Sequence, residues 1–144
     1  MVANGYARTY QTQAIMTASP GQLVLLLYDG ALRFLSLAHV ALEAGNNDLT
    51  RFEVTNRNLQ RAQNIIAELK GTLNHDAGGA VAANLDRLYD YFNRRLIQAN
   101  FKKELAPVVE VEGLLRELRD AWAEMLQRTG GGVRAPTGEM RNVA

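Results

Sequence analysis

Residues 19–43, SPGQLVLLLYDGALRFLSLAHVALE, carry the signals of a long helix. Ser19 can accept a hydrogen bond from the amide three residues later, Pro20 suits the first helical turn, and Gln22 can reach back to complete a capping box. Apolar residues then recur at intervals of three and four, which is the period of an α-helix. This stretch predicts a helix from about Pro20 to Glu43.

The same period continues through the rest of the chain, interrupted by caps and helix breakers. Gly45 is expected to end the first helix in a left-handed conformation, and Asp48 and Asn74 are expected to cap later helices. The later helices are predicted over about 48–73, 74–100 and 107–129. Long helices joined by short links pack as antiparallel neighbours. The predicted fold is an all-α, antiparallel, up-down-up-down four-helix bundle over residues 19–128.

The two ends of the chain differ from this pattern. Residues 1–18 form a polar leader with isolated aromatic residues, and residues 129–144 form a glycine-rich tail. The tail is short of apolar residues, and we expect both ends to be mobile unless something holds them.

Composition excludes several classes of protein. The 144 residues are 47% apolar and 22% charged, which is typical of a folded domain and not of a disordered chain. A formal charge of +1 provides no net field for nucleic acid. No cysteine is present, so disulfides and thiolate metal sites are excluded. The apolar run Leu23 to Tyr28 is too short to span a bilayer, and the chain is expected to be intracellular without membrane insertion.

Candidate catalytic and metal sites are weak. A di-iron site in a bundle needs a glutamate three residues before each histidine, and neither His39 nor His75 has one. Asp29 is expected to pair with Arg33 one turn later on the helix surface. We therefore predict no metal, no cofactor and no enzymatic activity.

The helical faces divide into core stripes and a surplus. The predicted core residues of the second, third and fourth helices are Phe52, Leu59, Ala62, Ile66, Leu69 and Leu73; Val81, Leu85, Leu88, Phe92, Leu96 and Ala99; and Val108, Val111, Leu115, Leu118, Trp122 and Met125. The first helix is apolar over an arc of about 200°, roughly twice what one core face needs. The residues left outside these stripes are Leu25, Leu32 and Val40 on the first helix, Val54 and Ile65 aligned with Asn58 and Arg61 on the second, and Tyr91 near Arg95 on the third.

Two interpretations account for this surplus, and both can hold. The leader can fold back over the first helix, with Tyr6, Tyr10 and Ile15 as anchors. The surplus can also form a groove that binds amphipathic helices of another protein through apolar anchors. A leader in the groove would then be displaced by the partner.

Short motifs follow one another in a fixed order along about residues 10–126. They are Tyr10-Gln11, Thr17-Ala18-Ser19-Pro20-Gly21-Gln22-Leu23, Leu27-Tyr28-Asp29-Gly30-Ala31, Arg61-Ala62-Gln63-Asn64-Ile65-Ile66, Gly78-Gly79, Asn84-Leu85, Leu88-Tyr89-Asp90-Tyr91, Leu96-Ile97-Gln98-Ala99-Asn100, and finally Leu118 and Trp122. Taken in this order, the motifs resemble the flagellar secretion chaperone FliS family. Gln22 stands where the family usually has glutamate, and it still permits the capping box.

The resemblance implies a cytoplasmic chaperone without enzymatic activity. Such a protein binds the disordered C-terminal region of flagellin, prevents premature polymerisation, and delivers flagellin to the flagellar type III export gate. The predicted flagellin contacts are Val54, Asn58, Arg61, Ile65, Tyr91 and Arg95, with Leu25, Leu32 and Val40 as a second patch. Tyr6, Tyr10 and Ile15 are assigned to the movable leader, and Tyr10 is also a candidate contact for the export gate.

A monomer or a weak homodimer is expected. The alternative hypothesis is a homodimeric helical-bundle interaction module that does not bind flagellin, in which the surplus surface serves self-association.

Overall fold

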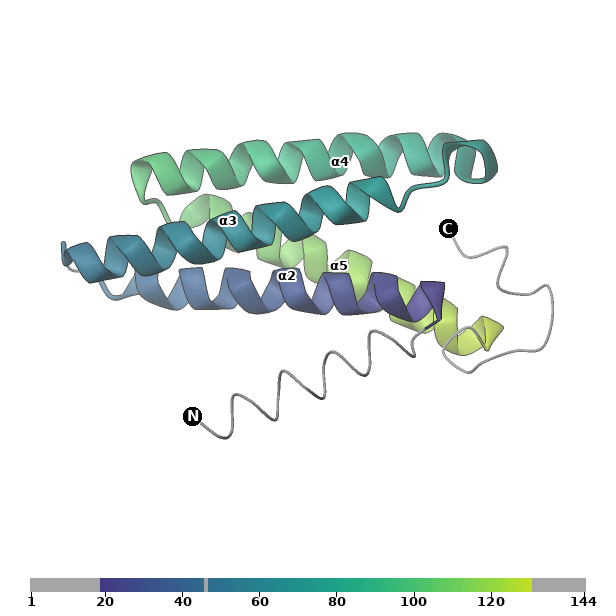
Figure 1. Cartoon of the computed structure of the whole chain (residues 1–144), viewed down its shortest axis with the longest axis horizontal. Helices are drawn as coiled ribbons and strands as arrows, with labels where there is room; N and C mark the ends of the chain where they lie inside the picture. Colours follow the sequence, from purple (N-terminus) through teal and green to yellow (C-terminus); the bar gives the residue numbers. More distant parts are fainter. Residues whose placement is uncertain (1–18, 46, 131–144) are drawn as a thin grey trace.

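The computed structural model describes residues 19–45 and 47–130, and within them the chain forms four α-helices and no strand (Figure 1). The helices are α2 (Pro20–Glu43), α3 (Leu49–Gly71), α4 (His75–Lys102) and α5 (Ala106–Thr129). Each helix runs antiparallel to the one before it. The predicted all-α class is confirmed.

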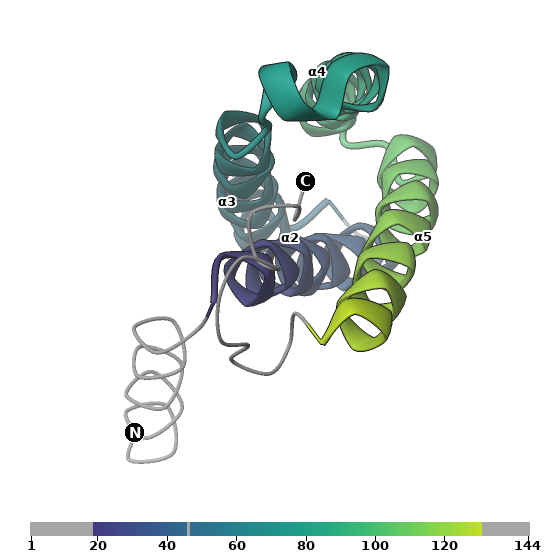
Figure 2. The ribbon, with the colours of Figure 1, turned by 90° about the vertical axis from the view of Figure 1, so that its right-hand side faces the viewer.

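The helices are arranged as a ring in which α5 closes against α2 (Figure 2). α2 packs against α3 and α5, and α4 packs against the same two helices. α2 and α4 therefore lie on a diagonal of the bundle. This is the predicted up-down-up-down four-helix bundle.

Local side-chain chemistry sets the helix ends. Ser19 Oγ accepts from the Gln22 amide at 3.2 Å, and Gln22 Oε1 accepts from the Ser19 amide at 3.3 Å, so the predicted capping box is present. The side chains of Asp48 and Asn74 accept amide hydrogen bonds at the starts of α3 and α4, as predicted. Gly130, directly after α5, has a φ of 70°, a left-handed conformation that glycine adopts without steric cost.

The core is a single apolar cluster to which all four helices contribute. Its largest fully buried side chains are Phe92, Leu35, Leu59, Ile66, Leu69, Leu96, Leu115, Val108 and Val111. Most positions of the predicted stripes lie in or against this cluster. Tyr89, which is not part of the predicted stripe of this helix, is also buried there.

Val81 corrects one core prediction, because its side chain is 67% exposed. Gly79, two residues earlier, has non-helical backbone angles (φ 51°, ψ −125°) and kinks α4 near its start. The helical period therefore does not carry through this turn, and Val81 does not follow the stripe of Leu85 and Phe92.

Polar side chains connect α2 to α5 along the length of both helices. Trp122 Nε1 donates to the Gly21 carbonyl at 2.8 Å, and His39 Nδ1 lies 2.5 Å from Glu112 Oε1. Arg119 Nε donates to Asp29 Oδ1 at 2.8 Å. Asp29 thus pairs with α5, and its predicted pairing with Arg33 on the same helix is wrong.

α2 is long and apolar enough to cross a membrane by length and composition alone. One such helix is weak evidence for a membrane span, since the core helix of a bundle passes the same test. In this fold the Tyr28, Leu35 and Ala38 side chains of α2 are buried in the shared core.

Candidate functional site

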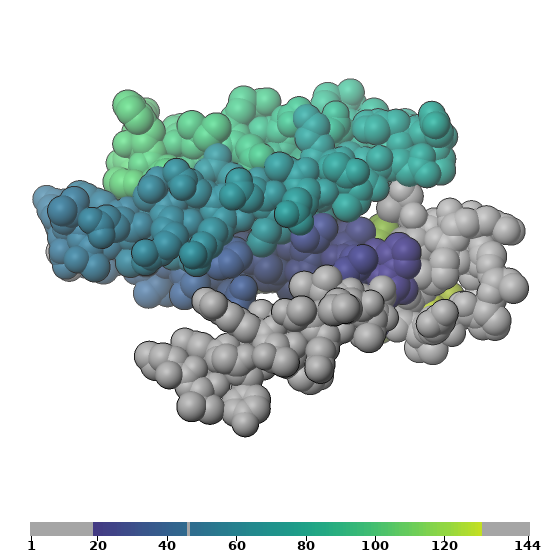
Figure 3. Space-filling view, viewed as in Figure 1, coloured from purple at the N-terminus to yellow at the C-terminus, as the bar shows by residue number. Residues whose placement is uncertain are grey.

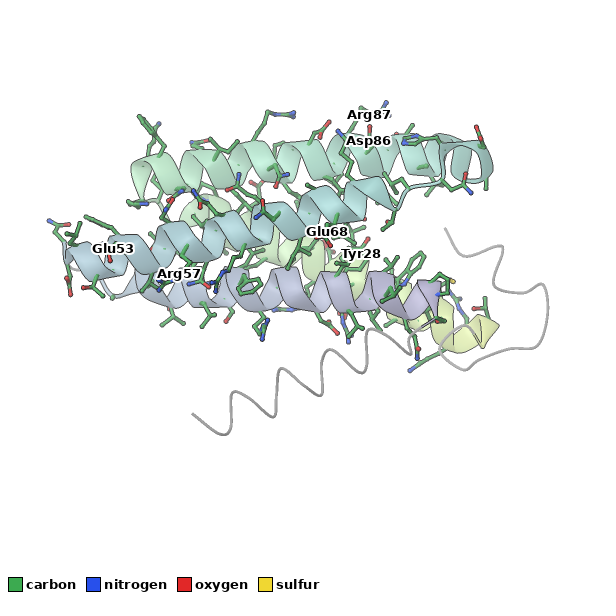
Figure 4. The ribbon with its side chains drawn as sticks, in the orientation of Figure 1. Tyr28, Glu53, Arg57, Glu68, Asp86 and Arg87 are labelled. Carbon is green, nitrogen blue, oxygen red and sulfur yellow. The ribbon has the colours of Figure 1, made fainter. Side chains whose placement is uncertain are left out.

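An apolar groove lies on the bundle surface between the N-terminal half of α2 and the C-terminal half of α3, and we call it the α2/α3 groove. Figure 3 shows these two helices side by side. The cavity has a volume of about 530 Å³. Its lining combines apolar side chains with charged and hydroxyl groups: Leu23, Leu26, Leu27, Asp29, Gly30, Arg33, Ile65, Glu68 and Thr72. Glu68 is labelled on α3 in Figure 4.

Gly30 allows α2 and α3 to approach closely at the floor of this groove. A Cβ atom added at Gly30 would lie 3.2 Å from the Ile65 Cδ1 atom, which is tighter than an ordinary contact. A larger residue at this position would therefore crowd the Ile65 side chain, which also lines the groove.

Cationic side chains flank the continuation of the groove. The guanidinium groups of Arg33 and Arg61 lie 4.9 Å and 5.6 Å from the centre of the Phe34 ring, which is cation–π geometry. Farther along α2, Leu37 and Val40 are exposed. These positions follow Leu26 and Arg33 at helical spacing, so the apolar stripe extends beyond the cavity.

The predicted contacts on α3 separate into three that suit this surface and one that does not. Ile65 lines the groove, Arg61 is exposed at its edge, and Val54 is half-buried on the same helical face. Asn58 is only 5% exposed, and its Nδ2 donates to the Val54 carbonyl at 2.8 Å. Asn58 is therefore a buried residue whose side-chain amide is hydrogen-bonded within its own helix. The prediction that it points outward is wrong.

Tyr91 and Arg95 lie elsewhere, on the side of α4 that faces α5. The Tyr91 hydroxyl donates to Glu110 Oε2 at 2.7 Å, and Arg95 Nε donates to Glu110 Oε1 at 2.6 Å. These hydrogen bonds, with that from Tyr91 the larger, lower the pKa of Glu110, and the same bond raises the pKa of Tyr91. The structure therefore does not bring Tyr91 and Arg95 together with Ile65.

The predicted second patch on α2 does not form one surface. Leu32 is 9% exposed and belongs to the core, Leu25 is half-buried, and Val40 is exposed. The prediction of Leu32 as an outward residue is wrong, because α5 covers this side of α2 through the contacts of Trp122, Glu112 and Arg119 described above. Tyr6, Tyr10 and Ile15 of the leader lie outside the described residues.

The sequence pattern did not identify the leucines of α2 as the floor of a groove. Leu23, Leu26 and Leu27 were part of the excess apolar arc of the first helix, and that excess was the signal. Gly30 gave no such signal, because its effect depends on the approach of Ile65.

A second apolar cavity of about 390 Å³ opens at one end of the bundle. It is lined by Tyr28, Leu73, Gly78, Val81, Ala82, Leu85, Leu118, Ala121, Trp122 and Met125. Gly78 and Val81, which lie on either side of the kink at Gly79, are among the lining residues. No pattern in the sequence had predicted this cavity.

The described residues contain no group of three or more His, Asp or Glu side chains that could hold a metal ion. The polar side chains that line the α2/α3 groove are Asp29, Arg33, Glu68 and Thr72. Such an arrangement suits the binding of an apolar segment with a polar edge.

Comparisons with known proteins agree on one family. The family model described as "Flagellar protein FliS" matches residues 2–129. Three similar proteins are each named flagellar secretion chaperone FliS. The protein of Bacillus subtilis (strain 168) is 44% identical, covering 88% of this chain and 89% of the relative. The protein of Salmonella typhimurium is 40% identical, with 83% and 86% covered. The protein of Escherichia coli (strain K12) is 37% identical, with 84% and 86% covered.

Proposed function

This chain belongs to the FliS family of flagellar secretion chaperones, and from that membership we propose that it binds the disordered C-terminal segment of flagellin in the α2/α3 groove. A flagellar export chaperone of this kind is not an enzyme. In the proposal, binding takes place in the cytoplasm, prevents premature polymerisation, and precedes delivery to the type III export gate.

The observation that carries the proposal is the open apolar floor between α2 and α3. Leu26, Ile65 and their neighbours form an apolar surface that the bundle does not cover within the described residues. An amphipathic helix binds such a surface through apolar residues at helical spacing. Arg33 and Arg61 offer cationic groups, and Asp29 and Glu68 offer carboxylates, to polar residues on the outer edge of such a segment.

The length of the surface suits a segment that folds as it binds. Ordering a disordered segment costs about 2–5 kcal/mol or more, and each buried Leu, Ile or Phe anchor contributes about 1.5–3 kcal/mol. Several anchors are therefore needed. The stripe from Leu23 to Val40 runs for roughly 26 Å along α2, which is room for several helical turns of a partner.

The leader belongs to the same proposal. We propose that the leader, residues 1–18 with Tyr6, Tyr10 and Ile15, would cover the groove in the free protein and be displaced by flagellin, with Tyr10 as a candidate contact for the export gate. We also propose residues 19–128 as the chaperone domain, with residues 129–144 outside it.

Calorimetry with the full chain and a synthetic peptide of the flagellin C-terminal segment tests this function. We expect binding with a negative heat-capacity change, and a gain of helix by circular dichroism. Leu26→Asp should weaken binding at least about tenfold, because it places a carboxylate on the apolar floor. Val109→Asp is the matched control, because Val109 is exposed on α5 and lines neither cavity described above.

No binding at a peptide concentration of about 100 μM would rule out the function. Equal affinity of Leu26→Asp and the control would place the segment outside the α2/α3 groove. A stable homodimer by light scattering that ignores the peptide would favour the self-association module instead.

A further inference from the structure

A groove of a different chemical character lies on the other side of α3, against the C-terminal half of α4. Figure 3 shows α4 and α2 on opposite sides of α3. This α3/α4 groove has a volume of about 760 Å³, and primary amides dominate its walls. It is lined by Asn56, Gln60, Gln63 and Asn64 of α3, and by Ile97, Asn100, Phe101 and Lys103 at the end of α4. Among the described residues, no carboxylate belongs to this lining.

Two apolar side chains project from the α4 wall of this groove. Phe101 is 86% exposed and Ile97 is 58% exposed, and they lie one helical turn apart on the same face. Single exposed apolar residues are ordinary on a protein surface. An adjacent pair at the wall of a groove instead forms an anchoring surface for an apolar side chain of a partner.

Hydrogen bonds fix which groups donate and which accept at the polar end of the groove. Lys103 Nζ, which can only donate, bonds to Asn100 Oδ1, and Asn100 Nδ2 then donates to Asn56 Oδ1 at 2.7 Å. This chain of bonds uses the oxygen of Asn56 and directs its NH₂ group away from Asn100. The groove consequently presents donors at this end: the Asn56 amide and the remaining ammonium hydrogens of Lys103.

The ammonium of Lys103 has no carboxylate within ion-pair distance among residues 19–45 and 47–130. Burial, and to a smaller extent the positive charge of Arg51, lower the pKa of Lys103. A negative charge brought to this end would offset both effects.

We propose that the α3/α4 groove is a second protein-binding site, which takes an acidic polypeptide segment with a carboxylate against Lys103 and Asn56 and an apolar side chain against Ile97 and Phe101. The site is distinct from the flagellin groove, because the two surfaces lie on opposite sides of α3. A nucleic-acid strand fits less well, since the formal charge of the whole chain is only +1.

Fluorescence anisotropy with the full chain tests the site. The probe is a labelled amphipathic peptide with leucines on one face and glutamates on the adjoining edge, and its control carries glutamine at each glutamate. We expect the acidic peptide to bind about tenfold more tightly than the control, as for one charge-assisted hydrogen-bonded pair. Lys103→Gln should remove that difference in affinity. Phe101→Ser should lower the affinity for the acidic peptide about tenfold.

Matched variants separate this site from general charge and from the flagellin groove. Lys102→Gln removes the neighbouring exposed cation, which does not line the groove, and should leave binding unchanged. Leu26→Asp should also leave binding of the acidic peptide unchanged, while it lowers the affinity for the flagellin peptide. Phe101 is largely exposed, so its replacement leaves the fold intact.

Three results would overturn the proposal. The first is equal affinity for the acidic peptide and its glutamine control. The second is loss of binding of the acidic peptide by the Leu26→Asp variant, which would place that peptide in the α2/α3 groove. The third is tighter binding of a single-stranded oligonucleotide than of the acidic peptide.

Discussion

The hydroxyl oxygens of Tyr28 and Tyr89 lie 2.5 Å apart inside the bundle and connect α2 to α4 across its diagonal. Both side chains are buried among apolar residues. Burial raises the pKa of each phenol, so both hydroxyls stay protonated at neutral pH. The pair satisfies two polar groups that the core would otherwise leave without partners.

Replacing one member of this pair is expected to cost more than replacing both. Tyr28→Phe leaves the Tyr89 hydroxyl buried without a partner, which should lower the free energy of unfolding by about 1–3 kcal/mol. The double variant Tyr28→Phe, Tyr89→Phe should recover much of this loss. Urea unfolding of the wild type, the two single variants and the double variant measures the coupling energy between the two hydroxyls. Strictly additive losses in the free energy of unfolding would contradict the role of the pair.

His39 makes the stability of the α2–α5 contact dependent on pH. The hydrogen bond to Glu112, with a smaller contribution from Glu43, raises the pKa of His39 above its ordinary value. The protonated form is therefore favoured in the folded state. Its contribution is complete below the unfolded pKa of about 6.5 and is lost as the pH rises through the folded pKa.

Thermal unfolding of the wild type and His39→Gln between about pH 5 and pH 9 tests this dependence. The difference in melting temperature should be largest at the acidic end and should shrink toward the alkaline end. A constant difference across the range would show that protonation of His39 does not matter for stability.

Gly30→Leu should block the α2/α3 groove without unfolding the bundle. The new side chain projects toward Ile65, whose end group can shift. Removal of a mid-helix glycine gains about 0.8–1 kcal/mol of helix propensity, which offsets crowding. We expect the free energy of unfolding to change by less than about 1 kcal/mol while affinity for the flagellin peptide falls at least tenfold. Unchanged affinity would show that the peptide does not enter the cavity.

Variants at Arg61 and Tyr91 distinguish the two clusters into which the predicted contacts separate. Arg61→Ser alters the edge of the α2/α3 groove, whereas Tyr91→Phe removes only the hydroxyl that donates to Glu110. In calorimetry with the flagellin peptide, Arg61→Ser should weaken binding severalfold, and Tyr91→Phe should leave it unchanged. The reverse order would move the binding surface to the α4/α5 side of the bundle.

The predictable parts of this fold rest on local chemistry. Ser19, Asp48 and Asn74 bond to amides within a few residues, so their positions in the sequence were enough to predict where the helices begin. The excess of apolar residues on α2 likewise predicted an uncovered surface, because one helix cannot bury more than its neighbours cover.

The parts that could not be predicted depend on which helix covers which face. The helical period placed Leu32 outside the core arc, and only the position of α5 shows that this side is buried. Asp29 had a plausible partner one turn away in Arg33, but Arg119, distant in sequence, occupies that role. The register between helices is a long-range property that periodicity does not contain.

The even number of antiparallel helices determines where the two ends of the bundle can be labelled. The start of α2 and the end of α5 lie at the same pole of the bundle (Figure 1). A dye or surface linker attached to an exposed residue at either of these two helix ends is therefore held at that pole. The junction of α4 and α5, which carries Phe101, lies at the opposite pole, so such an attachment leaves that region facing the bulk solution.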